Sequence, residues 1–349
     1  MKAGFTMSRN KKILNAVFVL LIFGLTIFYV FHGEDLGKIA AAIEHSNLYY
    51  WIAAVISILF FIGGESVIIH YMMNTFGQRT QLTHCFLYSF VGFFFSCITP
   101  SATGGQPMQI YFMKKDRIPV AVSTVILMIV TITYKFVLVI IGVLVLILKP
   151  EPVMEYLRPV TGWMHLGIAL NIFSVTAMCL LVFHPTLATK IMLSIINFLC
   201  KLHILKDKEY RIKKFEGIME QYRNVSTYFW THINVIINVL LITIVQRFFY
   251  FFVTWLVYKS FGLQGTGMIT IVLLQGMISV AVDMLPLPGG MGISERLFLE
   301  MFVPVFGAIT VPALIVTRGL SFYTELLVSA IFTVVAYITI GKRKDSKIS

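Results

Sequence analysis

Six apolar runs are each long enough to cross a lipid bilayer, and this feature limits what the chain can fold into. A spanning segment meets no water in the hydrocarbon region, so it must satisfy its own backbone hydrogen bonds as a helix. The chain is 58% hydrophobic and 13% charged, which is the composition of a polytopic membrane protein. The six runs cover residues 13–31, 49–72, 119–148, 163–183, 232–258 and 312–340.

Two further apolar runs lead into breaks that contain proline, and a shorter apolar segment follows each break. The runs cover 85–98 and 268–285, and the segments that follow them cover 108–113 and 293–306. Proline lacks the backbone donor that a helix needs, so the helix ends at each break. We interpret the two regions as re-entrant hairpins, over 85–113 and 268–306. The alternative is that each hairpin half spans the bilayer, which gives eight or more helices.

The two breaks recur in matching frameworks. Phe76-Gly77 precedes Gly104-Gly105 by the same distance that separates Phe261-Gly262 from Gly289-Gly290, and the two copies lie 185 residues apart. Interrupted hydrophobic segments at corresponding places in two halves indicate the binding site of a transporter. The sequence therefore predicts two membrane repeats, over 1–160 and 161–349.

Loop charges predict the topology. Basic residues cluster before the first run, after the last run, at 114–117 and at 190–223, and basic loops favour the cytoplasm. Both termini are then cytoplasmic, and a basic cytoplasmic loop (184–230) joins the repeats. Each repeat has three full spans, an odd number, so the repeats have opposite orientations. We expect an all-α inverted repeat with six full spans and two hairpins.

Seven ionisable side chains fall within or close to the apolar segments. Each costs roughly 2.5–3.5 kcal/mol at the bilayer centre if it is unpaired. They either form salt bridges or line a polar cavity between the repeats, in which the three cations bind an anionic phosphate. The cations are Lys135, Arg247 and Arg318, and the carboxylates are Glu65, Asp283, Glu295 and Glu325. Glu295 is also placed to cap the half-helix that follows the second break.

The candidate substrate-binding residues combine these charges with the polar and glycine residues of the breaks. They are Thr103, Gly104, Gly105, Gln106, Lys135, Arg247, Gly289, Gly290, Glu295 and Arg318. Glu65, Asp283 and Glu325 are candidates for coupling or for salt bridges. The four cysteines form no CxxC pair, so we expect no metal site and no cofactor. The formal charge of +12 lies in loops beside spans, which favours anionic lipid headgroups as partners and not nucleic acid.

The segments Thr99–Pro107 and Pro286–Glu295 resemble the two signature segments of the lysylphosphatidylglycerol synthase transmembrane family, which is also called flippase-like. The resemblance covers about residues 10–341. It implies the membrane portion of a multiple peptide resistance factor, which moves lipid across the bilayer. In that factor a separate cytoplasmic domain attaches the amino acid to phosphatidylglycerol. We expect this chain to lack that domain, so a lysyltransferase activity would be a family label only.

Three functions stay open. The leading hypothesis is a bacterial inner-membrane translocase for a phospholipid or an aminoacylated or lipid-linked headgroup. No Walker motif is present, which argues against an ATP-driven pump. The alternatives are a membrane-embedded enzyme that modifies lipids and an accessory partner of a separately encoded transferase. A homo-oligomer is also compatible with the sequence.

Overall fold

A computed structural model describes residues 36–184, 186–191, 193–194 and 208–341 of the chain. Within these residues the regular secondary structure is helical and contains no strand. Five helical segments are long and apolar enough to cross a membrane, and two shorter helices are also apolar. The expected all-α polytopic fold is therefore confirmed. The expected first span, 13–31, lies outside the described residues.

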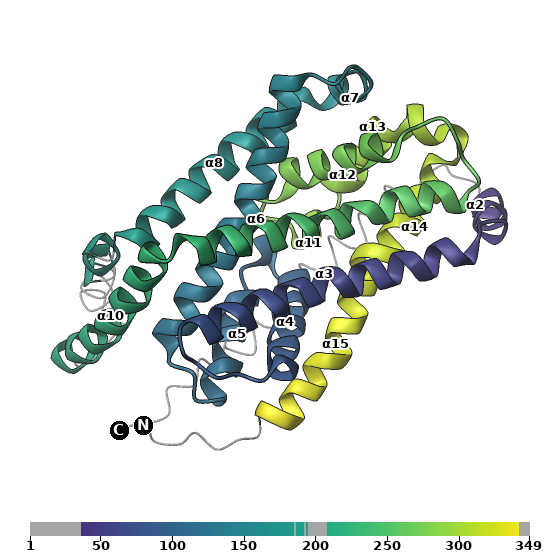
Figure 1. The fold of residues 1–349 in the computed structure, drawn as a ribbon. Coiled ribbons are helices and arrows are strands. Elements are labelled where there is room, and N and C mark those ends of the chain that lie inside the picture. The colour runs from purple at the N-terminus through teal and green to yellow at the C-terminus, as the bar shows by residue number, and fades with distance from the viewer. Residues whose placement is uncertain (1–35, 185, 192, 195–207, 342–349) are drawn as a thin grey trace.

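Two helices of 28 residues, α3 (Leu48–Thr75) and α11 (Ile233–Ser260), pack along each other through the middle of the molecule (Figure 1). They are antiparallel. The backbone N–H of Asn47, before α3, donates to the carbonyl of Ser260, at the end of α11, at 2.8 Å. At the other end, the Tyr228 hydroxyl donates to the carbonyl of Thr75 at 2.6 Å. The first and last residues of α11 lie one repeat spacing, 185 residues, after the first and last residues of α3.

The first break joins α4 (Leu82–Cys97) to α5 (Gly105–Lys115) through the short turn η1 (Pro100–Ala102). Ser101 has a φ of 49°, a left-handed conformation that a helix does not accommodate. The Thr99 hydroxyl stabilises the break: it donates to the carbonyl of Phe95 at 2.6 Å and accepts from the N–H of Gly104 at 2.9 Å. Thr99 thus satisfies one backbone carbonyl near the end of α4 and one backbone N–H at the start of α5.

The second break joins α12 (Met268–Val282) to α13 (Ile293–Phe306) through η3 (Pro288–Gly290). Gly289 and Gly290 have φ values of 57° and 67°, which glycine adopts at little cost. In Figure 1 the pair α4 and α5 lies in the lower part of the molecule, and α12 and α13 lie in the upper part. The two broken helices therefore approach the centre from different ends.

The remaining helices surround these elements. In chain order they are α2 (Leu36–Glu44), α6 (Val120–Leu148), α7 (Glu151–Leu157), η2 (Arg158–Val160), α8 (Thr161–Phe183), α10 (Lys208–Thr231), η4 (Gly307–Ile309), α14 (Thr310–Arg318), η5 (Gly319–Tyr323), α15 (Thr324–Ala336) and η6 (Tyr337–Gly341). The region expected as a basic loop between the repeats thus contains the long helix α10, which packs against α6. η5 is a π-helical turn between α14 and α15.

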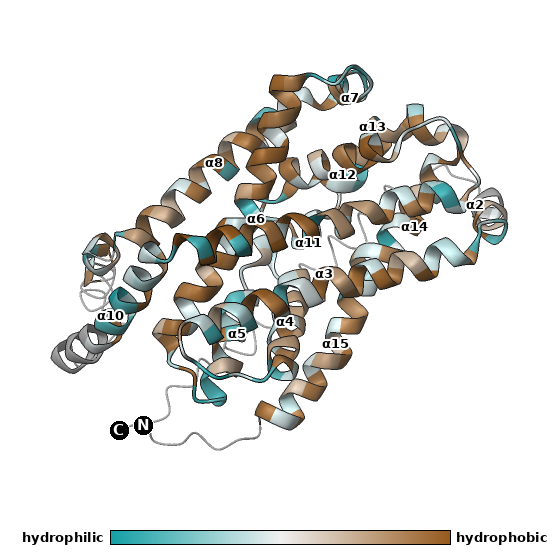
Figure 2. Cartoon of the chain, viewed as in Figure 1, coloured by the Kyte–Doolittle hydropathy of each residue, from teal (hydrophilic) through white to brown (hydrophobic). Residues whose placement is uncertain are grey.

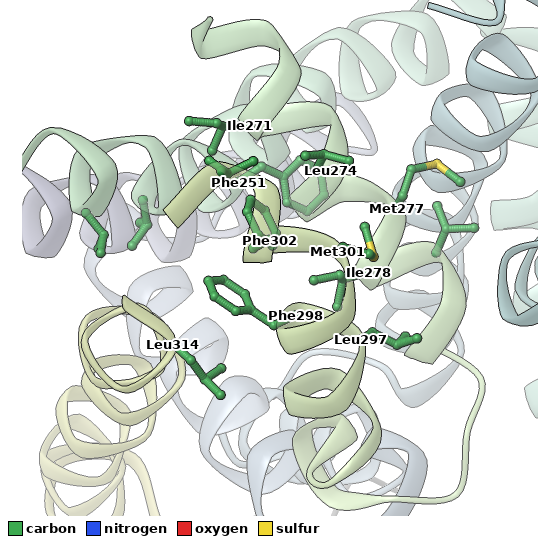
Figure 3. Close-up of a cluster of buried hydrophobic side chains, with 14 of the residues drawn as sticks. Phe251, Ile271, Leu274, Met277, Ile278, Leu297, Phe298, Met301, Phe302 and Leu314 are labelled. Atoms are coloured by element: carbon green, nitrogen blue, oxygen red, sulfur yellow. The ribbon is translucent and has the colours of Figure 1, made fainter. Parts of the chain in front are cut away.

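Apolar packing fixes the second broken helix. Phe298 and Phe302 of α13 stack with ring centroids 4.4 Å apart. Figure 3 shows these rings close to Leu274 and Ile278 of α12 and to Leu314 of α14. These side chains are almost fully buried, so each contributes about 1.5–3 kcal/mol of hydrophobic stabilisation.

The outward faces of the spanning helices are also apolar. Figure 2 shows hydrophobic residues along most of α3, α8, α11 and α15. On α15, Leu327, Ile331 and Val334 are 60–65% exposed and recur at helical spacing along one face. In water such a stripe would be unfavourable, so we expect this face to contact lipid.

Candidate functional site

The two breaks contact each other. The Ser101 hydroxyl in the first break donates to the carbonyl of Leu285 in the second at 3.3 Å. Their backbones also match. Thr99 and Leu287 are both extended before a proline, and Ser101 and Gly289 are both left-handed after it. The two breaks are therefore the same local structure built from different residues.

The two glycine pairs have different roles in this shared backbone conformation. Gly289 and Gly290 do use the left-handed freedom of glycine, whereas Gly104 and Gly105 have negative φ values and lie at the start of α5. A Cβ at Gly105 would collide with Ser96 and with the backbone of α4. The first pair therefore serves close helix packing, and the left-handed positions of the first break fall on Ser101 and Ala102.

A cavity of about 640 Å³ lies between the breaks and the long helices. Elements from both halves line it: α3, α4, α6, α11 and α15, together with the two breaks. Ser101, Ala102 and Thr103 line it and are exposed, so the cavity communicates with the surface beside the first break. Among the candidate residues, the lining includes Thr103, Gln106, Lys135, Arg247, Gly289, Gly290, Glu65, Asp283 and Glu325.

Lys135 is neutralised within the cavity. Its ammonium group forms an ion pair with Asp283, which follows α12, and both side chains are largely buried. The hydroxyl of Tyr134 donates to the other carboxylate oxygen of Asp283 at 3.0 Å. This pair connects α6 to the second break, and its charges compensate each other.

Arg247 is the cation without such compensation. Its guanidinium lies over the rings of Tyr134 and Phe61, 4.4 Å and 5.0 Å from their centroids. Its Nε is buried and has no hydrogen-bond partner among the residues that the structure describes. In the described part of the chain, no carboxylate lies within 4.0 Å of it. A buried donor without an acceptor is costly, so this position suits an anionic ligand.

Two carboxylates share the electrostatic environment of Arg247 without forming an ion pair with it. Glu65 on α3 accepts a hydrogen bond from the side-chain amide of Gln109 at 2.7 Å. Glu325 on α15 contacts the thiol of Cys97 at 3.5 Å. Both carboxylates therefore have neutral hydrogen-bond donors as their direct partners.

Arg318 and Glu295, both candidate binding residues, pair with each other and do not line the cavity. Arg318 Nε donates to Glu295 Oε1 at 2.6 Å, and Arg318 also donates to the carbonyl of Gly289 at 3.1 Å. The second oxygen of Glu295 accepts from the N–H of Gly292 at 2.6 Å and from the Ser294 hydroxyl at 3.0 Å. Glu295 thus caps α13 as the sequence suggested, and Arg318 ties the second break to α14.

At the first break, Gln106 donates to the hydroxyl of Thr131 and to the carbonyl of Leu127, the latter at 3.4 Å. Thr103 is exposed, and its hydroxyl donates to the carbonyl of Pro100 at 2.9 Å. Of these two side chains, Thr103 is the one at the accessible edge of the cavity.

Sequence reasoning missed several neutral residues of the cavity. Tyr134 and Phe61 hold the guanidinium of Arg247, and Tyr250 also lines the wall. The repeat spacing contained a signal for Tyr250, because it lies 185 residues after Glu65. The described residues include no group of three His, Cys, Asp or Glu side chains that could hold a metal ion.

A comparison with protein families matches residues 15–329 to the lysylphosphatidylglycerol synthase transmembrane region. The match covers most of the 349 residues and includes both breaks. The chain belongs to this family. Members of the family are membrane proteins of lipid metabolism or lipid translocation, so the chain is a multi-pass membrane protein associated with phospholipids. A search of curated proteins gives no match.

Proposed function

We propose that the chain is a bacterial inner-membrane lipid translocase that moves phospholipid headgroups between leaflets through the cavity between its halves. The observation that carries this proposal is Arg247, a cation inside the cavity that has no carboxylate partner among the described residues. A phosphate would satisfy its donors, because guanidinium groups bind phosphate oxygens in a bidentate manner. We therefore assign Arg247 as the headgroup phosphate site, with Thr103 at the entrance.

The antiparallel pairing of α3 and α11 supports an inverted repeat. Two helices related by the repeat spacing run in opposite directions, as they do when an axis in the membrane plane relates the halves. Two broken helices that meet between such halves can alternate the exposure of one site. A lipid needs only its polar headgroup to cross through the cavity, because its tails can stay in hydrocarbon.

The test is leaflet exchange by the purified chain in liposomes that contain a fluorescent phospholipid. A quencher added outside reports the lipid that has moved to the outer leaflet. We expect exchange without ATP, and we expect no aminoacylation of phosphatidylglycerol when lysyl-tRNA is supplied. Lysyl-lipid formation by the chain alone would instead support the enzyme hypothesis. Inactivity in both assays would support the accessory-partner hypothesis.

A further inference from the structure

We propose that Glu325 is an exchangeable proton-binding site, and that a proton on Glu325 accompanies an anionic headgroup through the cavity. This inference rests on the proposed function and adds to it a source of energy, since no nucleotide-binding motif is evident in the sequence.

Among the residues that the structure describes, the lining of the cavity has one more carboxylate than cation. Two cations, Lys135 and Arg247, and three carboxylates, Glu65, Asp283 and Glu325, line it. If all five are ionised, the lining carries one negative charge in excess. An uncompensated charge taken out of water is costly, and a carboxylate in that position is stabilised by protonation.

Glu325 is the carboxylate that is least stabilised as an anion. It is 7% exposed, and Cys97 Sγ, at 3.5 Å, is its one side-chain hydrogen-bond donor among the described residues. A thiol is a weak donor. The cations that face it are Arg247 from α11 and Arg318 from α14, both beyond 4.0 Å, and Arg318 is paired with Glu295. The remaining titratable groups that face it are Tyr250 from α11 and Glu65 from α3.

The other two carboxylates have stronger partners. Asp283 has the ammonium group of Lys135 and the hydroxyl of Tyr134. Glu65 accepts from the side-chain amide of Gln109 at 2.7 Å, and an amide N–H is a stronger donor than a thiol. Amide, hydroxyl and ammonium donors all favour the ionised form. The excess negative charge, and therefore the proton, belongs to Glu325.

Protonation of Glu325 links directly to headgroup binding. With Glu325 ionised the cavity lining carries a net charge of −1, and with Glu325 protonated it is neutral. An anionic phosphate beside Arg247 is repelled by the first state and accepted by the second. By thermodynamic reciprocity, bound phosphate then increases the proton affinity of the site. One proton and one singly charged headgroup would cross together without net charge movement.

Infrared difference spectroscopy of the purified chain tests the proton site without requiring transport. We expect a carbonyl band of a protonated carboxyl that disappears as the pH is raised, is absent from Glu325→Gln, and persists in Glu300→Gln. Glu300 is a suitable control because it lies outside the cavity in an exposed pair with Arg296. A band that survives in Glu325→Gln, or a wild-type chain without the band, would overturn the proposal. Reaction of the wild type with a hydrophobic carbodiimide gives a second readout: an adduct on Glu325 at acidic pH supports the proposal, and its absence there contradicts it.

A pH gradient across the liposome tests the coupling. With one proton per lipid, each unit of gradient should shift the leaflet distribution of an anionic lipid by up to about tenfold toward the alkaline side. Glu325→Gln should lose this shift, and Glu300→Gln should keep it. If the wild type exchanges lipid but its leaflet distribution does not change with the pH gradient, the coupling is overturned. A wild type that moves no lipid at all would contradict the proposed function, and the infrared band would still decide the proton site.

Discussion

The side-chain amide of Gln246 donates to the backbone carbonyl of Phe61 at 2.8 Å, and these two residues are 185 positions apart. They are therefore equivalent positions of the sequence repeat that contact each other where α3 and α11 cross. Equivalent residues of two antiparallel helices meet only at the two-fold axis that would relate them. Phe61 also lines the cavity and lies under Arg247, so the proposed phosphate site stands beside this axis.

Close packing at this crossing depends on Gly64. A Cβ at that position would lie 2.8 Å from Gln246 Cγ and 3.0 Å from Gln246 Cβ. We expect Gly64→Ala to destabilise the chain by about 1–3 kcal/mol through overpacking. Gly217→Ala is the matched control, because no atom of the described residues lies within 4 Å of a Cβ there. Thermal unfolding in detergent measures both, and equal melting temperatures for the two variants would contradict the packing argument.

Arg247→Ala should reduce lipid exchange by about tenfold or more while the protein still accumulates in the membrane. Exchange should fall because the headgroup phosphate loses its guanidinium partner. The protein should still accumulate because Arg247 has no ion-pair partner among the described residues, so its loss leaves no carboxylate newly unpaired. Arg247→Lys should recover part of the activity, since lysine keeps the charge but loses the bidentate geometry. Exchange rates in liposomes with matched protein content are the measurement. Normal exchange by Arg247→Ala would refute the phosphate site.

Arg318→Ala should behave differently. It removes the partner of a buried carboxylate, Glu295, and also a hydrogen bond to the second break. Breaking a buried pair by removing one partner costs about 3–5 kcal/mol, so we expect reduced accumulation in the membrane. Pairing Arg318→Met with Glu295→Gln should restore part of that loss. Fluorescence size-exclusion chromatography follows both variants. A stable single variant with impaired exchange would instead place Arg318 in the transport site.

The inverted repeat predicts which side of the membrane two loops face. Arg79 and Gln264 are both exposed, follow α3 and α11 respectively, and are separated by the repeat spacing. Single cysteines at these positions should react with an impermeant maleimide from opposite sides, with position 79 protected in intact cells. Labelling of both positions from the same side would rule out the inverted arrangement.

The sequence predicted the helical spans well because their signal is local. The ends of α3, α6 and α11 lie within a few residues of the expected runs, since each boundary follows a change from apolar to polar residues. The breaks were also visible, because proline acts on the backbone around it. The left-handed backbone at Ser101 and Ala102 was not visible, because the repeat spacing aligns Gly104-Gly105, and not these two residues, with Gly289-Gly290.

The pairing of the charges could not be predicted, because it depends on which helices become neighbours. Lys135 and Asp283 are far apart in the chain, and only the packing of α6 beside the second break brings them together. The same packing leaves Arg247 between two aromatic rings. From the sequence, the three cations were equivalent candidates. In the fold, Lys135 and Arg318 form ion pairs, and Arg247 has none among the described residues.

The most direct test of the phosphate site at Arg247 is a density map of the chain in lipid nanodiscs that contain an anionic phospholipid. We expect a phosphate density beside the guanidinium of Arg247, between the two breaks, with the acyl tails leaving the cavity toward the bilayer. A cavity that holds no headgroup, with Arg247 closed onto Glu65 or Glu325 as an ion pair, would contradict it.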